Sequence, residues 1–286
     1  MQNTDKKVNP LLSLMRQPKL YIKLPSRGQY WKDGSLKISP NGEYPVYSMT
    51  ARDEILIKTP DALLNGQAVV SMIESCLPNV IDGWECPQID LDTILIAIRI
   101  ATYGETMDTT VKFKDIEGLY NVSLKEMLDS LNSNIAWNER IELDNTTVAY
   151  VKPLNYKNVA RMSADSFEVQ RIINLVNDDN IDDEQKKELF KIHFTKLTQI
   201  NMDIVAESIF KVDTTAGSVT DTDFIKEFVY NCDKDLFNKI RSHIDQIQES
   251  NTIKPLRVKA TEEMIAAGAD EEIETPVFFD PASFFV

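Results

Sequence analysis

The chain has 286 residues, of which 45 are acidic and 31 are basic, and its formal net charge at pH 7 is −14. This acidic balance disfavours nucleic acid as a partner, because nucleic-acid affinity depends on basic side chains that neutralise phosphates. Three cysteines without a close pair are typical of a reducing cytosol. The polar N-terminus and the short apolar runs predict neither a secretory signal nor a membrane span.

The first elements predicted along the chain are turns, which are followed by a capped helix. The string LPSRGQYW at residues 24–31 leads into a hairpin turn around Pro40-Asn41-Gly42. Thr50 is expected to cap a short helix, because Asp53 at the third helical position can reach back to the cap. Thr59-Pro60 then ends that helix, since the residue before proline is pushed out of the α region.

Three further helices are predicted before residue 104. They cover residues 61–65, 67–77 and 90–101. The last is expected to be capped by Asp90 and ended by Gly104, and it is apolar almost all round. Such a helix belongs at the centre of a core.

Three strings in the first half of the chain carry a family resemblance. They are LPSRGQYW, MTARDEILIKTPDALLNG and DLDTILIAIRIATYG, in that order. Together they resemble the T4-type bacteriophage baseplate proteins, which are associated with the tail hub and its assembly. The resemblance implies a non-enzymatic, cofactor-free part in tail morphogenesis, with other phage tail proteins as partners. It implies assembly in the host cytoplasm and a place in the virion tail baseplate.

Members of that family often place paired cysteines after the ATYG segment. Residues 108–120 of this chain contain neither cysteine nor histidine, so we expect no metal site there. Cys76 and Cys86 flank a short connection and are interpreted as buried structural residues, because zinc normally recruits four ligands. His193 and His243 lack companions at metal-ligand spacing and are interpreted as helix residues.

The acidic loop after residue 177 has part of a calcium-loop pattern. Asp178, Asn180 and Asp182 have the spacing of its first ligands. However, Asp183 stands where glycine is required and Leu189 where a bidentate glutamate is required. No phosphate loop, serine elbow or paired catalytic motif is visible either, so the sequence predicts no enzyme.

The second half predicts strands first and helices later. A hairpin is expected from 111–113 and 119–122, followed by a helix that Ser123 caps and by two strands within 140–151. Beyond Pro153, five amphipathic helices predict a helical bundle. They cover residues 156–176, 183–194, 198–212, 221–232 and 233–248.

These elements predict an α+β fold that is predominantly α-helical. It combines a small mixed N-terminal domain containing β-hairpins with a C-terminal helical bundle. The expected divisions are an N-terminal arm at 1–23, a mixed family domain at 24–152, a helical domain at 153–250 and an acidic tail at 251–286 that ends in an aromatic segment.

Arg99 interrupts the apolar helix at 90–101, so its charge must reach solvent or find a partner. We expect a structural ion pair with Asp53 or Glu54 that orients two helices. The alternative is a direct contact between Arg99 and a partner protein.

The last twelve residues concentrate aromatic side chains after an acidic stretch at 262–274 that we expect to be solvated or weakly helical. Exposed, such a segment would promote aggregation. It is therefore expected either to fold back on the protein's own surface or to dock into a partner or neighbouring subunit. The residues of this partner-binding hypothesis are Pro276, Val277, Phe278, Phe279, Phe284, Phe285 and Val286.

Two roles within the family stay open at this point. The chain is either a baseplate hub subunit or a chaperone that holds hub or tape-measure components. A net charge far from zero keeps a binder of apolar clients soluble, which favours the chaperone. An early phage effector that binds a host protein is the competing class, and a homo-oligomer is compatible with any of them.

Overall fold

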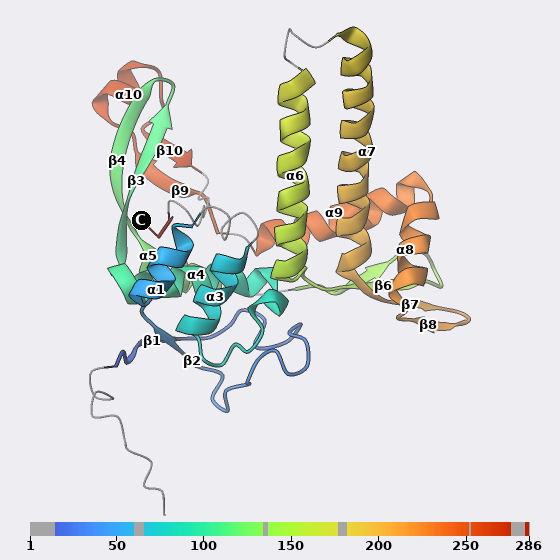
Figure 1. The fold of residues 1–286 in the computed structure, drawn as a ribbon, viewed down its shortest axis with the longest axis horizontal. Helices are drawn as coiled ribbons and strands as arrows, with labels where there is room; N and C mark the ends of the chain where they lie inside the picture. The colour runs from blue at the N-terminus through green and yellow to red at the C-terminus, as the bar shows by residue number, and fades with distance from the viewer. Residues whose placement is uncertain are drawn as a thin grey trace, which may run out of the picture.

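The computed structural model describes residues 15–59, 66–133, 137–176, 182–251, 253–275 and 284–285. The fold is mixed α and β, with small antiparallel sheets and more helix than strand. Figure 1 shows two helices that stand upright from a body of shorter elements, with separate groups of strands on either side of them.

The N-terminal body consists of a two-stranded sheet and three helices. Strand β1 (Pro18–Ile22) pairs antiparallel with β2 (Tyr44–Tyr47), and it is followed by α1 (Ala51–Ile57), α3 (Gln67–Cys76), the 3-10 helix η2 (Gly83–Glu85) and α4 (Gln88–Tyr103). The predicted turn at 40–42 is present, but β2 pairs with the distant β1 rather than with the residues just before the turn. The predicted helix at 61–65 lies outside the described residues.

The N-terminal ends of α1 and α4 differ in how they are capped. The cap at Thr50 is confirmed, because its side chain accepts a hydrogen bond from the Asp53 amide while the Asp53 carboxylate accepts one from the Thr50 amide. The cap at Asp90 is wrong, since α4 begins two residues earlier. The Asp90 side chain is turned into the core, where it accepts hydrogen bonds from Ser26 and Trp31.

The central position predicted for α4 is confirmed. Ile94, Ile96 and Ile98 are all fully buried, which places apolar side chains on opposite sides of the helix. Around them lies the larger of the two hydrophobic cores, with side chains from β1 through α5 and from Phe284 and Phe285.

A pair of stacked hairpins extends from this body, at the left of Figure 1. The first, β3 (Thr106–Phe113) with β4 (Ile116–Ser123), is longer than predicted and continues into α5 (Leu124–Ser133). The second is formed by β9 (Leu256–Lys259) and β10 (Glu272–Thr275), with α10 (Glu262–Ala266) between them. Tyr120 joins the two by donating a hydrogen bond to the Lys259 carbonyl at 2.8 Å. The acidic stretch at 262–274 thus contains the short helix α10 and exposed carboxylates, as predicted, and it also contains most of the strand β10, which was not predicted.

A four-stranded antiparallel sheet forms the second part of the molecule. Its order is β5 (Arg140–Glu142), β6 (Val148–Val151), β7 (Ile209–Thr214) and β8 (Gly217–Val219). Helices α8 (Thr222–Asn231) and α9 (Lys234–Ser250) bury side chains in the core that this sheet shares. The sheet combines two strands from before Pro153 with two strands from after it. The division of the chain into domains at that residue stays a prediction.

The upright helices are α6 (Tyr156–Val176) and α7 (Asp183–Ser208), which pack against each other. The two helices predicted at 183–194 and 198–212 are one continuous helix as far as Ser208. The chain then becomes strand β7, because its apolar side chains Ile209 and Val212 are buried in the sheet's core. In place of a five-helix bundle, the structure has this helical pair, called the arm below, and two helices packed on a sheet.

Candidate functional site

The arm has a narrow buried seam along its length. The seam contains Met162 and Val169 from α6 and His193 and Ile200 from α7. At the base of the arm, the buried carboxylate of Asp203 is 3.2 Å from the Lys226 ammonium and 3.6 Å from the Arg161 guanidinium. These contacts fix the base of the arm against α8, and further from the base the described residues of α6 and α7 pack against each other.

One side of α7 presents an exposed stripe that combines phenylalanine with lysine. Phe190 is 47% exposed and Phe194 is 62% exposed, and their rings stack with centroids 6.4 Å apart. Lys187 and Lys191 are exposed and share this side of the helix, because residues three and four positions apart lie on one face. We call these four residues the arm face.

A groove of about 600 Å³ lies between α8 and the four-stranded sheet. Its α8 side is formed by Phe224, Glu227, Phe228 and Asn231, which again follow helical spacing. Phe224 is 64% exposed, and Glu227 and neighbouring Asp223 are exposed carboxylates. We call this cavity the α8 groove, and its other lining residues are Thr147, Val212, Thr214, Val219 and Ile225.

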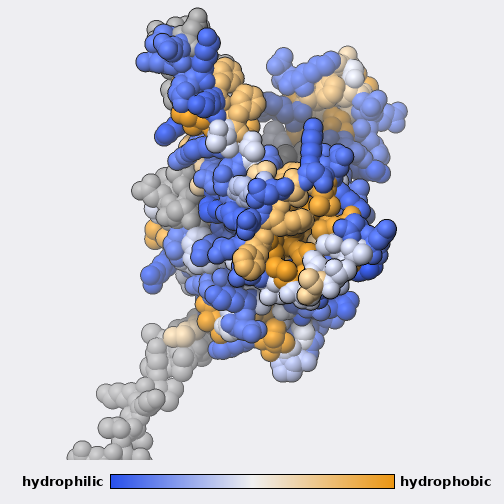
Figure 2. Space-filling model, turned by 90° about the vertical axis from the view of Figure 1, so that its right-hand side faces the viewer, coloured by the Kyte–Doolittle hydropathy of each residue, from blue (hydrophilic) through white to orange (hydrophobic). Residues whose placement is uncertain are grey.

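The arm and the groove are apolar on the same side of the molecule. Figure 2 shows hydrophobic side chains gathered in a large patch over the α8 end of the molecule, with a second group above it on the arm. Contiguous apolar surface of this kind marks protein interaction sites on soluble proteins. Two such surfaces lie on this one face.

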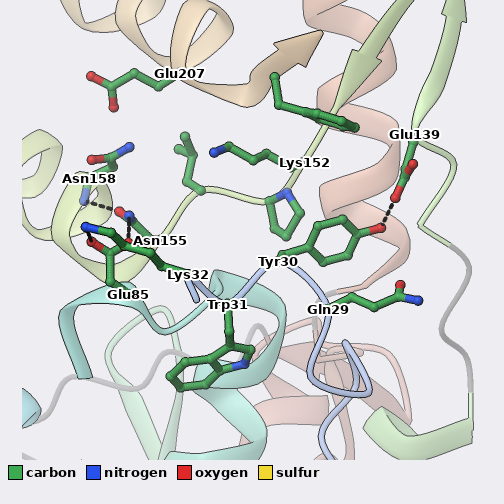
Figure 3. Close-up of a pocket in the computed structure, with 13 residues that line it drawn as sticks. Gln29, Tyr30, Trp31, Lys32, Glu85, Glu139, Lys152, Asn155, Asn158 and Glu207 are labelled. Carbon is green, nitrogen blue, oxygen red and sulfur yellow. Dashed lines mark hydrogen bonds and ion pairs between the residues drawn. The ribbon is translucent and has the colours of Figure 1, made fainter. Parts of the chain in front are cut away.

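A more polar pocket of about 630 Å³ lies where the two hydrophobic cores meet (Figure 3). The Tyr30 hydroxyl donates a hydrogen bond of 2.5 Å to Glu139, and the Asn155 amide donates one of 2.8 Å to Glu85. Burial and the Glu139 carboxylate both raise the pKa of the Tyr30 phenol, which therefore stays protonated at neutral pH. These two hydrogen bonds connect the N-terminal body to the second part of the molecule.

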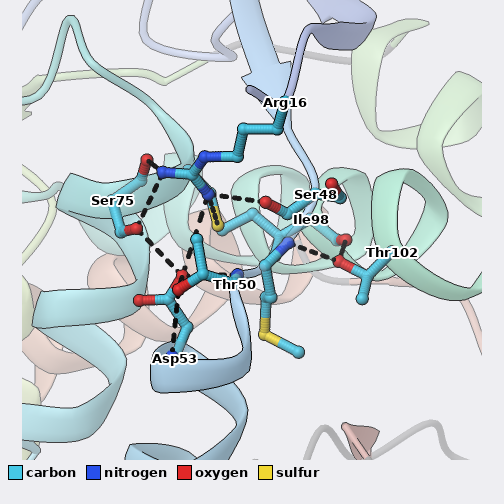
Figure 4. Close-up of polar contacts among 9 residues, drawn as sticks. Arg16, Ser48, Thr50, Asp53, Ser75, Ile98 and Thr102 are labelled. Atoms are coloured by element: carbon cyan, nitrogen blue, oxygen red, sulfur yellow. Dashed lines mark hydrogen bonds and ion pairs between the residues drawn. The ribbon is translucent and has the colours of Figure 1, made fainter. Parts of the chain in front are cut away.

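Arg16 occupies the position beside Asp53 that the sequence assigned to Arg99 (Figure 4). Its guanidinium donates to the Ser48 carbonyl at 2.6 Å and to the Ser75 hydroxyl at 2.9 Å, and it lies 3.7 Å from the Asp53 carboxylate. The Ser75 hydroxyl in turn donates to Asp53 at 2.9 Å. This network attaches the chain just before β1 to α1 and α3.

Arg99 forms no ion pair with Asp53, Glu54 or any other described residue. The side chain is only 9% exposed, its Nε and one terminal nitrogen lack hydrogen-bond partners, and its guanidinium lies 4.3 Å from the centroid of the Tyr103 ring. Burial lowers the pKa of Arg99, against a smaller opposing effect of Tyr103. The predicted pair is replaced by a cation–π contact within one helix.

We therefore expect Arg99→Met to leave the free energy of unfolding within about 1 kcal/mol of the original value, or to raise it. The substitution keeps an apolar stem in the core and removes a buried charge whose attraction to an aromatic ring is worth about 1–2 kcal/mol. Chemical unfolding followed by circular dichroism measures the change.

The matched control is Arg16→Met, which makes the same replacement at an arginine with partners. Removing its charged hydrogen bonds should lower the free energy of unfolding by about 2 kcal/mol. A loss above about 3 kcal/mol for Arg99→Met would reveal a stabilising partner of Arg99 and contradict the structural interpretation.

The aromatic residues at the end of the sequence are described only in part. Phe284 and Phe285 are buried in the larger core, and the centroids of their rings are 5.1 Å apart. The Tyr103 hydroxyl donates a hydrogen bond to the Phe285 carbonyl at 3.1 Å. For these two residues the structure places the segment on the protein's own core. The other members of the hypothesis, Pro276, Val277, Phe278, Phe279 and Val286, lie outside the described residues.

Cys76, Cys86 and His243 lie apart from the two apolar surfaces, whereas His193 lies inside the seam of the arm. Cys76 and Cys86 are buried free thiols, and burial raises the pKa of both, to about 12 for Cys76. His243 contacts the Asn138 carbonyl at 3.0 Å. Within the described residues, no group of three His, Cys, Asp or Glu is placed to hold a metal ion, and no helix is long and apolar enough to cross a membrane. The Asp178 loop lies outside them, apart from Asp182 onward.

The sequence interpretation missed both apolar surfaces, although it placed α7 and α8 as amphipathic helices. The available signal was a Lys-Phe-Lys-Phe pattern at positions 187, 190, 191 and 194, with phenylalanines on a side that also carries charge. Helical spacing identifies such a side, but it does not say whether another element covers it.

The chain matches the model of the family described as T4 bacteriophage base plate protein over residues 18–286. No curated protein and no solved structure matches it. The match confirms the resemblance carried by LPSRGQYW and the strings that follow it, and it extends from the first half into the arm, the four-stranded sheet and the terminal hairpin. The chain therefore belongs to the T4 bacteriophage base plate protein family.

Proposed function

We propose that the chain is a non-enzymatic structural subunit of the phage baseplate hub, which associates with other tail proteins in the virion. The observation that carries this proposal is the presence of two separate exposed apolar surfaces, the arm face and the α8 groove, on one chain. A structural subunit is held in an assembly by contacts with neighbouring chains, which include further copies of itself, and exposed apolar surfaces provide such contacts.

A transient assembly chaperone for hub or tape-measure components is the second candidate. Its support is the net charge of −14, which keeps a protein with exposed phenylalanines soluble before it meets its client. Both candidates place the chain in the host cytoplasm during assembly. They differ in whether it remains in the finished tail.

Quantifying the chain in purified virions separates the two roles. A subunit is expected at a fixed stoichiometry of several copies per particle, measured by mass spectrometry against a tail protein of known copy number. The infected-cell lysate serves as the control for expression. Abundance in the lysate together with absence from virions would contradict the subunit proposal and favour the chaperone, or an effector if cross-linking captures host rather than tail proteins.

A further inference from the structure

The arm face and the α8 groove are complementary in charge as well as apolar. Lys187 and Lys191 flank the phenylalanines of the arm face, whereas Asp223 and Glu227 flank those of the groove. None of these four side chains forms an ion pair with another residue in the described part of the chain, while Lys226 between the two carboxylates is engaged by Asp203. Two unpaired lysines therefore lie beside the phenylalanines of the arm face, where Glu184 and Glu188 are also exposed on α7, and two unpaired carboxylates lie beside those of the groove.

The positions of the two surfaces along the axis of the arm also suit an antiparallel contact between two chains. Phe190 is 18 residues before Ser208, so the arm face lies about 27 Å along α7 from the base of the arm at 1.5 Å per residue. The α8 helix meets α7 near that base, where the Tyr230 hydroxyl donates to Asp203 at 3.0 Å. If two arms lie side by side in opposite directions, the far end of each reaches the base of the other.

We infer that the arm face of one chain docks into the α8 groove of a second copy, and that the second copy returns the same contact. A two-fold arrangement of this kind uses both surfaces of each chain once, so it closes as a dimer and does not propagate into fibres. It would bury Phe190, Phe194 and Phe224 together and bring the lysines of each arm to the carboxylates of the facing groove. Opposite charges at the rim fix the antiparallel register and exclude the parallel one.

This inference names the partner of the two surfaces on which the proposed function depends. It is tested with the purified full chain alone, whereas the proposed function is tested in virions, so that either can fail without the other. Sedimentation velocity over a range of concentrations and at low and moderate salt should show a reversible dimer. Added salt should weaken it, because the charges at the rim are exposed.

Charge reversal provides the decisive comparison. The double substitution Lys187→Glu with Lys191→Glu, or Asp223→Lys with Glu227→Lys, should weaken dimerisation by about tenfold or more, because each sets like charges against one another. Combining all four substitutions in one chain should restore the dimer. Mixing the two double variants should give a heterodimer, since both of its arm and groove contacts then join opposite charges.

The matched control for the lysine reversal is Lys19→Glu with Lys58→Glu, which makes the same change in net charge at exposed lysines on β1 and after α1. It should leave dimerisation unchanged, and circular dichroism should show that every variant folds. The proposal is overturned if the native chain is monomeric at all concentrations, if its dimer withstands both reversals, or if the fourfold variant dimerises no better than the doubles. Capture of a different tail protein by a monomeric chain through these surfaces would likewise replace the second copy as occupant.

Discussion

Replacing Phe285 by alanine is expected to lower the free energy of unfolding by about 3–5 kcal/mol, the usual cost of removing a buried phenylalanine side chain. Phe285 is fully buried in the larger core, where its ring contacts Phe284 at nearly a right angle. Truncation leaves a cavity that the surrounding helices cannot fill without moving. Urea unfolding of the purified chain, followed by circular dichroism, measures the loss.

Phe167→Ala is the matched control, because this phenylalanine on α6 is 63% exposed. Its loss should change stability by less than about 0.5 kcal/mol, as is usual for surface sites. If Phe285→Ala were as mild as the control and instead abolished binding to another tail protein, the aromatic segment would dock in a partner rather than in its own chain. A destabilised chain supports docking within the molecule.

Asp90→Ala is the second substitution with a large expected effect, a loss of about 2–5 kcal/mol. The fully buried carboxylate accepts hydrogen bonds from the Ser26 amide at 2.7 Å, from the Ser26 hydroxyl at 2.5 Å and from the Trp31 indole at 2.8 Å. Alanine leaves the amide and indole donors buried without an acceptor, at about 1–3 kcal/mol each. This is the physical role of the LPSRGQYW string, whose serine and tryptophan bind the first turn of α4.

The same carboxyl should make stability depend on pH in a direction opposite to that of a salt-bridged aspartate. Burial raises the pKa of Asp90 from 3.8 to about 6 in the folded chain, although its three hydrogen bonds act in the other direction. The folded state therefore holds the proton more tightly than the unfolded state, and this contribution is complete below pH 3.8 and is lost as the pH rises through about 6.

Asp90→Asn isolates that contribution, because asparagine does not titrate. Between pH 4.5 and 7.5 the native chain should lose about 2 kcal/mol more stability than the variant, given that one pKa unit corresponds to about 1.4 kcal/mol. Asp92, whose pKa is also raised to about 6 by burial, titrates in both proteins and cancels in the difference. Equal pH profiles for the two proteins would show that Asp90 does not titrate in this range.

The features that the sequence predicted correctly depend on residues close together in the chain. Thr50 and Asp53 are three positions apart, so their reciprocal capping is decided locally and does not require knowledge of the fold. The burial of α4 follows from its own composition, since a helix that is apolar almost all round has only one stable environment. These are also the segments that carry the family resemblance.

The features that it missed depend on residues far apart. Arg16 and Ser75, which are 59 positions apart, complete the surroundings of Asp53, and this partner could not be chosen over Arg99 without the paths of β1 and α3. Asp90 and Ser26 are 64 positions apart. The acidic stretch is part of a hairpin because β9 and β10 pair with each other and contact β4. The charges of the stretch alone do not indicate this pairing.

The connectivity of the arm has an evolutionary consequence. Strands β6 and β7 are antiparallel neighbours in the sheet, and everything between Val151 and Ile209 is topologically the loop of one β-hairpin. Such a connection can gain or lose whole helical turns at its far end while the strands keep their register, since closing a longer loop adds little entropic cost. Relatives of this chain are therefore expected to differ in arm length, and so in how far they reach, while keeping the sheet and the larger core intact.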